Sequence, residues 1–271
     1  MSGASREALA SARDSFDALL DNTSVDAAKL AEELAAVTAL LDREVSLRRV
    51  LTDPAQPGDA KAELAKRLLT GQVGDECADL IAGLVRSRWT ASRDLVDATE
   101  ELAAAADLVA AERSGALDDV EDEVFRFGRI VTSDAALRAA LTDRVADRSA
   151  KAALVRELLT GRANPVTERL VVRLVTLPRG RSLEAGLTAL SKLAADRRDR
   201  MVAVVTSAVP LSDQQKQRLG EGLAKLYGRR VHLNLDVDPE VIGGVQVRIG
   251  DEVINGTIAD RLAEAGRRMA G

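Results

Sequence analysis

The stretch MVAVVTSAVPLS (residues 201–212), followed after a helix-like segment by VHLNLDVDPEVIGGVQVRIGDEVINGT (231–257), decides the fold of this 271-residue chain. Apolar residues alternate with polar ones in these runs, which is the period of a β-strand, whereas the chain before residue 201 repeats its apolar residues at helical spacing. Between the runs, Ser212 and Gln215 form a capping box that predicts a helix start, and Gly228 predicts its end. Residues 201–271 therefore read as a small α/β domain.

Glycines and one aspartate mark the turns expected within this terminal domain. A pair of adjacent glycines predicts a backbone bulge or close packing, and a Gly-Asp dipeptide between two β runs predicts a turn. The predicted turn residues are Gly243, Gly244, Gly250, Asp251 and Gly256. A final amphipathic helix is expected to follow, and its apolar face consists of Ile258, Leu262, Ala265 and Met269.

Toward the N-terminus, the helical part of the chain contains an internal duplication. The segment SLRRVLTDPAQPGDAKAELAKRLLTG (46–71) aligns without a gap on ALRAALTDRVADRSAKAALVRELLTG (136–161), and half of the aligned positions are identical. At the same offset Glu33 aligns with Glu123. Two copies predict two tandem helical modules of five or six short helices each. We therefore expect a mainly α chain with three parts: module one (1–92), module two with its exit helix (93–200) and the α/β domain (201–271).

The first helix of each module carries a helically spaced apolar stripe. Small Ala-rich bundles suit the binding of a partner helix in a groove, so these stripes are candidates for lining one. The candidate positions are Ala8, Ala12, Phe16 and Leu19 in module one, and Leu102, Ala106 and Val109 in module two.

Composition restricts the class of protein. Hydrophobic residues make up 46% and charged residues 30%, as in soluble globular proteins, but aromatic residues are only 2%, so the cores must be built from aliphatic side chains. The net charge of −5 gives no basic footprint for nucleic acid. Residues 1–112 carry 12 basic and 21 acidic side chains, whereas the remainder carries 26 and 22, so we expect the halves to face different partners. No apolar stretch is long enough for a membrane helix, and no secretion signal is evident.

No residue cluster predicts catalysis, a cofactor or a metal. His232 is the single histidine and Cys77 the single cysteine, so a His-based triad, a multi-His metal site and an internal disulfide are excluded. Asp236, Asp238 and Asp251 lack the spacing of a calcium loop, and no phosphate-binding loop motif occurs. We expect Cys77 to be a buried apolar residue and His232 to be a structural strand residue. Trp89 is either a core residue or an anchor between the modules.

Three motifs together resemble the delta subunit of F-type ATP synthases, the bacterial counterpart of the oligomycin-sensitivity-conferring protein. They are VVTSAVPLS (204–212), D-P-x-x-I-G-G-V (238–245) and G-D-x-x-x-x-G-T (250–257). Asn255 and Thr257 stand where the family usually has Asp and Ser, and both keep the turn and capping chemistry. The helical segment 114–143 is also similar to the family, but typical members carry one helical module where this chain has two.

The resemblance implies a non-catalytic connector with two protein partners. Its helical part would receive N-terminal helices of the alpha subunits of the catalytic head, and its C-terminal region would bind the b subunits of the peripheral stalk. The chain would then resist rotor torque at the cytoplasmic face of the bacterial plasma membrane. An unrelated helical adaptor is the main alternative, and an enzyme of unknown type is a third. The sequence leaves open which module meets the head, and whether the chain is free or part of a larger stalk fusion.

Overall fold

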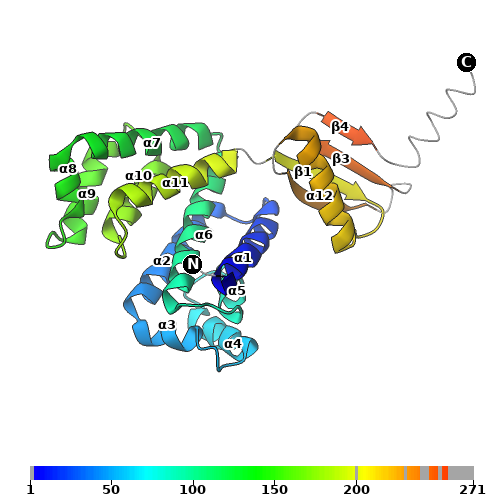
Figure 1. Ribbon diagram of the computed structural model, residues 1–271, viewed down its shortest axis with the longest axis horizontal. Coiled ribbons are helices and arrows are strands. Elements are labelled where there is room, and N and C mark those ends of the chain that lie inside the picture. Colours follow the sequence, from blue (N-terminus) through cyan, green and yellow to red (C-terminus); the bar gives the residue numbers. More distant parts are fainter. Residues whose placement is uncertain (1–2, 199–200, 229–230, 239–243, 250–251, 256–271) are drawn as a thin grey trace, which may run out of the picture. The chain divides into compact units, whose positions relative to one another are not determined.

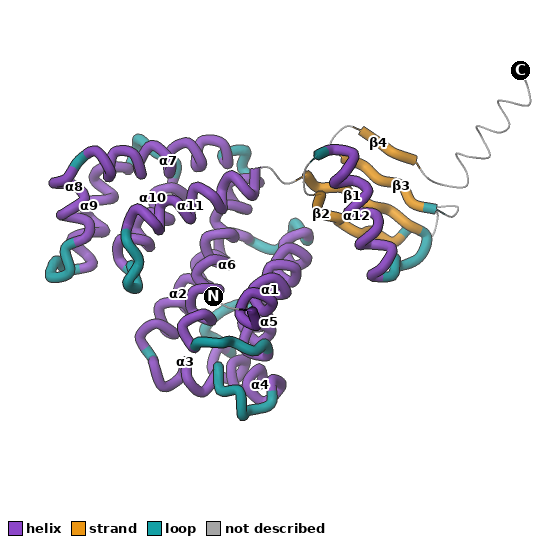
Figure 2. The backbone as a smooth tube through the Cα atoms, in the orientation of Figure 1, coloured by secondary structure: helices purple, strands orange, loops and turns teal. Residues whose placement is uncertain are grey.

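The computed structural model describes the chain except for residues 1–2, 199–200, 229–230, 239–243, 250–251 and 256–271. The chain forms two compact units, Met1–Ala195 and Asp196–Gly271, which are described separately. The first unit is helical, and the second contains a four-stranded mixed sheet with one helix against it (Figures 1 and 2). The predicted fold class, mainly α with a small C-terminal α/β part, is confirmed.

The helices of the first unit repeat at a constant offset along the chain. The bounds of α2, α4 and α5 shifted by 90 residues are the bounds of α7, α9 and α10, while α8 begins 90 residues after α3. The helices are α1 (Gly3–Asp21), α2 (Ala27–Arg43), α3 (Val45–Leu51), α4 (Gly58–Leu69), α5 (Asp75–Arg86), α6 (Ser92–Arg113), α7 (Leu117–Ser133), α8 (Ala135–Thr142), α9 (Arg148–Leu159), α10 (Pro165–Thr176) and α11 (Leu183–Arg198). Helix α6 is therefore both the last helix of the first copy and the first helix of the second.

A repeated carboxylate holds two helices together in each copy. In copy one the Glu33 carboxylate of α2 accepts a hydrogen bond of 3.0 Å from the backbone N–H of Gly74, directly before α5. In copy two the Glu123 carboxylate of α7 accepts one of 2.9 Å from the N–H of Asn164, directly before α10. A carboxylate on the unpaired N–H groups of a helix start satisfies a buried donor and favours the helix dipole. The alignment of Glu33 with Glu123 thus reflects one structural role.

Two further features recur at the same offset. In each copy, an arginine donates hydrogen bonds to carbonyl groups in the last turn of the preceding helix: Arg48 of α3 donates to α2, and Arg138 of α8 donates to α7. Gly71 and Gly161, the last residues of the two aligned segments, lie two residues after α4 and α9 with φ of 73° and 74°. Only glycine adopts this left-handed conformation without strain, so it ends each helix in the same way.

The two copies are packed to different extents. One continuous core fills the first copy and extends from Ala8 on α1 to Val109 on α6. In the second copy, two smaller cores lie along α7, α10 and α11. Equivalent apolar positions of the fifth helices are buried in both copies, namely Leu80, Leu84 and Val85 in copy one and Leu170, Leu174 and Val175 in copy two.

The second unit is a sheet with strand order β2-β1-β3-β4, where β1 (Met201–Ser207) pairs parallel with β2 (Val231–Val237) and antiparallel with β3 (Val245–Ile249), and β4 (Glu252–Asn255) pairs antiparallel with β3. Helix α12 (Asp213–Tyr227) packs its apolar residues against one sheet face, on Ala203, Val205, Val247 and Ile249. The predicted capping box of Ser212 and Gln215 is present, and Gly228 caps the helix end with φ of 67°.

Candidate partner-binding surfaces

The stripe predicted on α1 belongs to the core of module one. Ala8, Ala12 and Phe16 are buried, and only Leu19 is partly exposed. The opposite face of α1 is exposed and carries charged residues, among them Glu7 and Asp14. The apolar stripe therefore holds α1 against its own bundle, and a partner would meet the exposed face.

The stripe predicted for module two lies on α6 and joins the same core of module one. Leu102, Ala106 and Val109 are 0–2% exposed and pack within the cluster that holds Phe16 and Leu34. Helix α6 meets the second copy with other residues, Ala104, Leu108 and Ala111. Both sides of α6 are thus covered, which the repeat alignment alone does not reveal because aligned positions need not face the same neighbours.

Equivalent positions on α5 and α10 differ in their side-chain contacts. In module one, the Asp79 side chain is 66% exposed, and a Cβ added at Gly83 would find no atom within 4 Å. In module two the same positions are Arg169 and Arg173, and both side chains reach the Asp107 carboxylate on α6. The described ion pairs therefore join α10 to α6 in module two, whereas in module one Asp79 pairs with Lys66 of α4 at 2.6 Å and Gly83 carries no side chain.

The buried carboxylate of Asp107 was not singled out in the sequence. Arg169 donates to its Oδ1 from Nε at 3.0 Å and from Nη2 at 2.9 Å, and Arg173 pairs with Oδ2. Burial raises the pKa of Asp107 above its ordinary value, while Arg173 and Arg169 act in the opposite direction. The signal that could have identified it is its repeat partner Asp17, an acidic residue at a buried position of α1.

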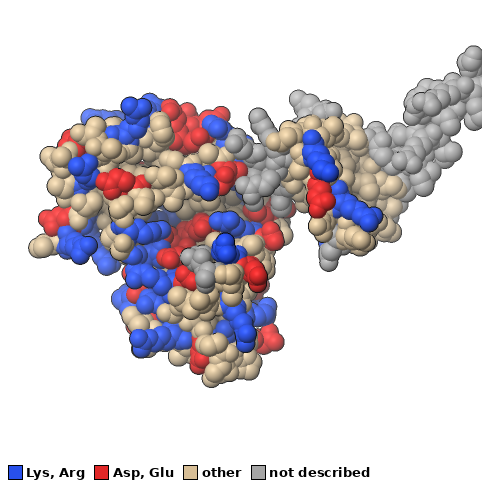
Figure 3. Space-filling model, in the orientation of Figure 1, with Lys and Arg blue, Asp and Glu red and all other residues tan. Residues whose placement is uncertain are grey.

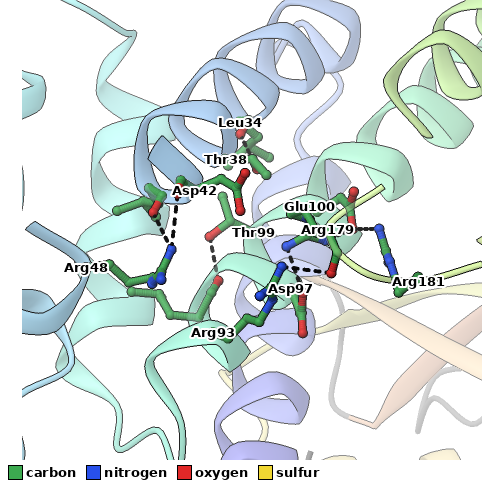
Figure 4. Close-up of polar contacts among 12 residues, drawn as sticks. Leu34, Thr38, Asp42, Arg48, Arg93, Asp97, Thr99, Glu100, Arg179 and Arg181 are labelled. Carbon is green, nitrogen blue, oxygen red and sulfur yellow. Dashed lines mark hydrogen bonds and ion pairs between the residues drawn. The ribbon is translucent and has the colours of Figure 1, made fainter. Parts of the chain in front are cut away.

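A second ionic group fixes the loop before α11 to the start of α6. The Arg179 side chain is 1% exposed and pairs with Asp97 and Glu100, while Arg181 pairs with Glu100 (Figure 4). Both charge signs occur on the visible face of the helices (Figure 3). Sequence reasoning missed this group because its members lie about 80 residues apart.

Chemistry-bearing side chains in the described part of the chain do not gather into a reactive site. There, no three His, Cys, Asp or Glu residues are placed to hold a metal ion. Burial, with a smaller effect of the nearby Glu33 carboxylate, raises the pKa of the Cys77 thiol to about 12. Trp89 is buried in the core of module one, where its indole N–H donates to the Leu84 carbonyl at 2.8 Å. Every described helix is too short or too polar to cross a lipid bilayer.

Most candidate residues of the second unit fall outside the described residues. These are Ile258, Leu262, Ala265 and Met269 of the predicted last helix and the turn residues Gly243, Gly250, Asp251 and Gly256. Gly244 is described, and its φ of 87° lies in the region that favours glycine. Two exposed apolar side chains that the sequence did not single out are Val209, before α12, and Leu226, near its end, at 67% and 68%.

Fold and surfaces together define a protein built of helical binding modules joined to a small α/β unit. A family model described as "ATP synthase delta (OSCP) subunit" matches residues 102–269. The chain belongs to the ATP synthase delta (OSCP) subunit family. This membership sets aside the alternatives of an unrelated adaptor and of an enzyme.

Relatives named ATP synthase subunit delta match over the whole chain. The protein of Streptomyces griseus is 76% identical over 271 residues, covering 100% of both chains. That of Streptomyces avermitilis is 72% identical and covers 99% of this chain and 98% of the relative. That of Thermobifida fusca is 46% identical over 271 residues and covers 100% of both. Full coverage means that the duplicated helical part has a counterpart in these relatives.

Proposed function

We propose that the two units of this chain divide the task of a connector: the helical unit binds the alpha subunits of the catalytic head, and the C-terminal unit binds the b subunits of the peripheral stalk. The chain is a non-catalytic connector subunit of the F-type ATP synthase, because it belongs to the delta (OSCP) family. It is a peripheral component of that membrane complex. It holds the head against rotor torque at the cytoplasmic membrane face, so that proton flow stays coupled to ATP synthesis.

Module one carries the proposed head contact. The observation that supports it is that Asp79 of α5 is 66% exposed and a Cβ at Gly83 meets no atom within 4 Å, whereas Arg169 and Arg173 of α10 are engaged in ion pairs with α6. A partner helix needs an accessible groove, and in module two arginine side chains already span that position. Acidic residues such as Asp14, Asp75 and Glu76 lie exposed on α1 and α5, so a positively charged segment would complement this face.

Transplanting the module-two ion pairs tests this proposal. Asp79→Arg with Gly83→Arg places two arginines where α10 has Arg169 and Arg173, and the buried Asp17 stands where α6 has Asp107. We expect the double variant to lose at least tenfold in affinity for an alpha-subunit N-terminal peptide, measured by calorimetry. Asp119→Arg, on the exposed face of α7, is the control and should bind as the parent does. Unchanged binding of the double variant would reject module one as the head contact.

A specific observation favours module two as the second candidate. The family match begins at residue 102 and therefore covers module two and the C-terminal unit. If module two makes the contact, removing Arg169 and Arg173 by substitution with alanine should change the affinity for the alpha peptide, whereas the variants at Asp79 and Gly83 should not. The two sets of variants separate the candidates, since one set lies on α5 and the other on α10.

The C-terminal unit carries the proposed stalk contact through the segment 258–271. The support is the apolar stripe of Ile258, Leu262, Ala265 and Met269 and the family match, which extends to residue 269. Deleting 258–271 should abolish binding to a C-terminal peptide of a b subunit while the alpha peptide still binds. Undiminished binding of the b peptide after the deletion would contradict the assignment.

A further inference from the structure

Helix α6 packs with two faces against two different cores. Leu95, Leu102 and Ala106 are buried in module one, and Ala104 and Leu108 are buried in the first core of module two. The helix runs unbroken for 22 residues from Ser92 to Arg113. A continuous helix shared by two bundles is a stiff connection along its axis, but apolar ridge-into-groove packing alone leaves a scatter of about 15–20° in the crossing angle of the second bundle.

Polar side chains on α6 add contacts that restrict the orientation of module two on this helix. Toward its N-terminal end, Asp97 pairs with Arg179 at 2.7 Å, and Glu100 pairs with both Arg179 and Arg181. Arg93 donates to the backbone carbonyl of Arg179 at 2.7 Å. Arg179 has a left-handed φ of 48°, so its loop is held in a conformation that few residues other than glycine adopt. The α10–α11 loop is thereby anchored through both the side chain and the backbone carbonyl of Arg179.

Asp107 forms the second anchor two turns further along α6. Its side chain is 0% exposed and forms ion pairs with two arginines of α10, Arg169 and Arg173. Breaking one partner of a buried pair leaves an uncompensated charge, so only one arrangement of α10 on α6 satisfies all three groups. Arg169 donates two N–H groups to Oδ1 and Arg173 donates one to Oδ2, and these charge-assisted hydrogen bonds add directional specificity to that arrangement.

The arginines of these anchors are not repeated at the equivalent positions of module one. The repeat partner of Arg179 is Trp89, which is a core residue there, and the partners of Arg169 and Arg173 are Asp79 and Gly83. The charged groups are therefore not part of the common fold of the two copies. They occur where the second copy meets the shared helix.

We propose that Asp107 and Arg179, with their partners, form a two-point lock that holds module two on α6 in a single orientation, so that helices α1 to α11 bear load as one rigid body. We call this set of contacts the seam lock. The seam lock lies within the chain itself and is independent of which partner binds which module.

Pulsed electron–electron distance measurements on the full-length chain test the lock. Spin labels go on Glu63→Cys in α4 and Ala153→Cys in α9, two exposed positions, while Cys77 stays unlabelled because it is buried. The parent should give one narrow distance distribution. Arg179→Gln combined with Asp107→Asn should at least double its width or add a second distance. A parent distribution as wide as that of the double variant, or a double variant as narrow as the parent, would overturn the proposal.

Two further variants complete the experiment: one is a control away from the seam lock, and the other replaces the double variant if that variant does not fold. Arg126→Gln removes an exposed ion pair with Asp122 on α7, away from the seam lock, and should leave the distribution unchanged. If the double variant does not fold, as judged by its helical circular dichroism, Arg179→Gln alone serves instead, because it removes the pairs with Asp97 and Glu100, whose side chains are 34% and 21% exposed. Broadening in Arg179→Gln supports the lock, and a parent-like width in that variant contradicts it.

Discussion

At the scale of single residues, buried polar and titratable groups give predictions that unfolding experiments can check. Cys77 has a thiol pKa raised by burial to about 12, against an ordinary value of 9.0. Between these values the unfolded chain loses the thiol proton that the folded chain retains, so the free energy of unfolding falls as the pH rises from 9 toward 12.

The prediction is that Cys77→Ala removes this thiol contribution, which amounts to at most ~1.4 kcal/mol per pH unit within the window. Urea unfolding at pH 8, 9.5 and 10.5 measures it, with the parent compared to the variant at each pH. The folded parent should also react with a thiol reagent at pH 8 only as fast as it unfolds. Rapid reaction of the native chain would contradict the burial of Cys77.

The repeated carboxylates give a second residue-scale prediction. Glu123 accepts from the Asn164 N–H and from the Thr167 hydroxyl, whereas Glu33 accepts from Gly74 alone among the hydrogen bonds described. We expect Glu33→Ala to cost about 1 kcal/mol and Glu123→Ala about 2–3 kcal/mol of unfolding free energy. Chemical denaturation measures both, and an equal or reversed order would show that the Thr167 contact adds no stability.

At the scale of elements, two helical glycines have opposite environments. A Cβ at Gly186 of α11 would clash with the side chain of Leu174, which is buried in the core of module two, whereas a Cβ at Gly83 of α5 meets nothing. Gly186→Ala should destabilise the chain by about 1–3 kcal/mol because Leu174 must repack. Gly83→Ala should stabilise it by up to ~1 kcal/mol through helix propensity. Thermal unfolding monitored by circular dichroism compares the pair, and a stabilised Gly186→Ala would refute the close packing of α10 on α11.

Sequence pattern predicted most elements because local rules decide them. The repeat predicted two sets of short helices at a constant offset, and Ser212, Gln215 and Gly228 predicted the caps of α12. What the pattern could not predict is which way a shared helix faces. Leu102, Ala106 and Val109 have the right spacing for a groove in module two, yet they complete the core of module one. Apolar periodicity identifies a buried face but not the neighbour that buries it.

The candidate surfaces were less predictable than the fold. The seam lock joins α6 to residues 169–181, and such pairings depend on tertiary structure that no local motif encodes. The stripe at Ala8, Ala12 and Phe16 is buried in the core of module one, so the other face of α1 is the one that solvent reaches. A test by Ala12→Glu would place a charge in the core, so surface positions such as Asp79 and Gly83 serve better.

At the scale of the whole molecule, the two units are expected to fold independently. The sheet and α12 form their own core, and the helical unit ends near Ala195. A fragment of residues 1–200 should keep a helical circular dichroism spectrum and the unfolding cooperativity of the parent's helical part. A spectrum with substantial β content, or a fragment that does not fold, would contradict the division into units.

In the proposed role, one chain connects head and stalk through different surfaces. Analytical ultracentrifugation of the purified catalytic head, the soluble part of the b subunits and this chain is the decisive experiment. The account predicts a complex of all three when the chain is present and separate head and b species when it is absent. If head and b subunits remain separate in the presence of the full-length chain, or assemble equally well without it, the connector role is contradicted.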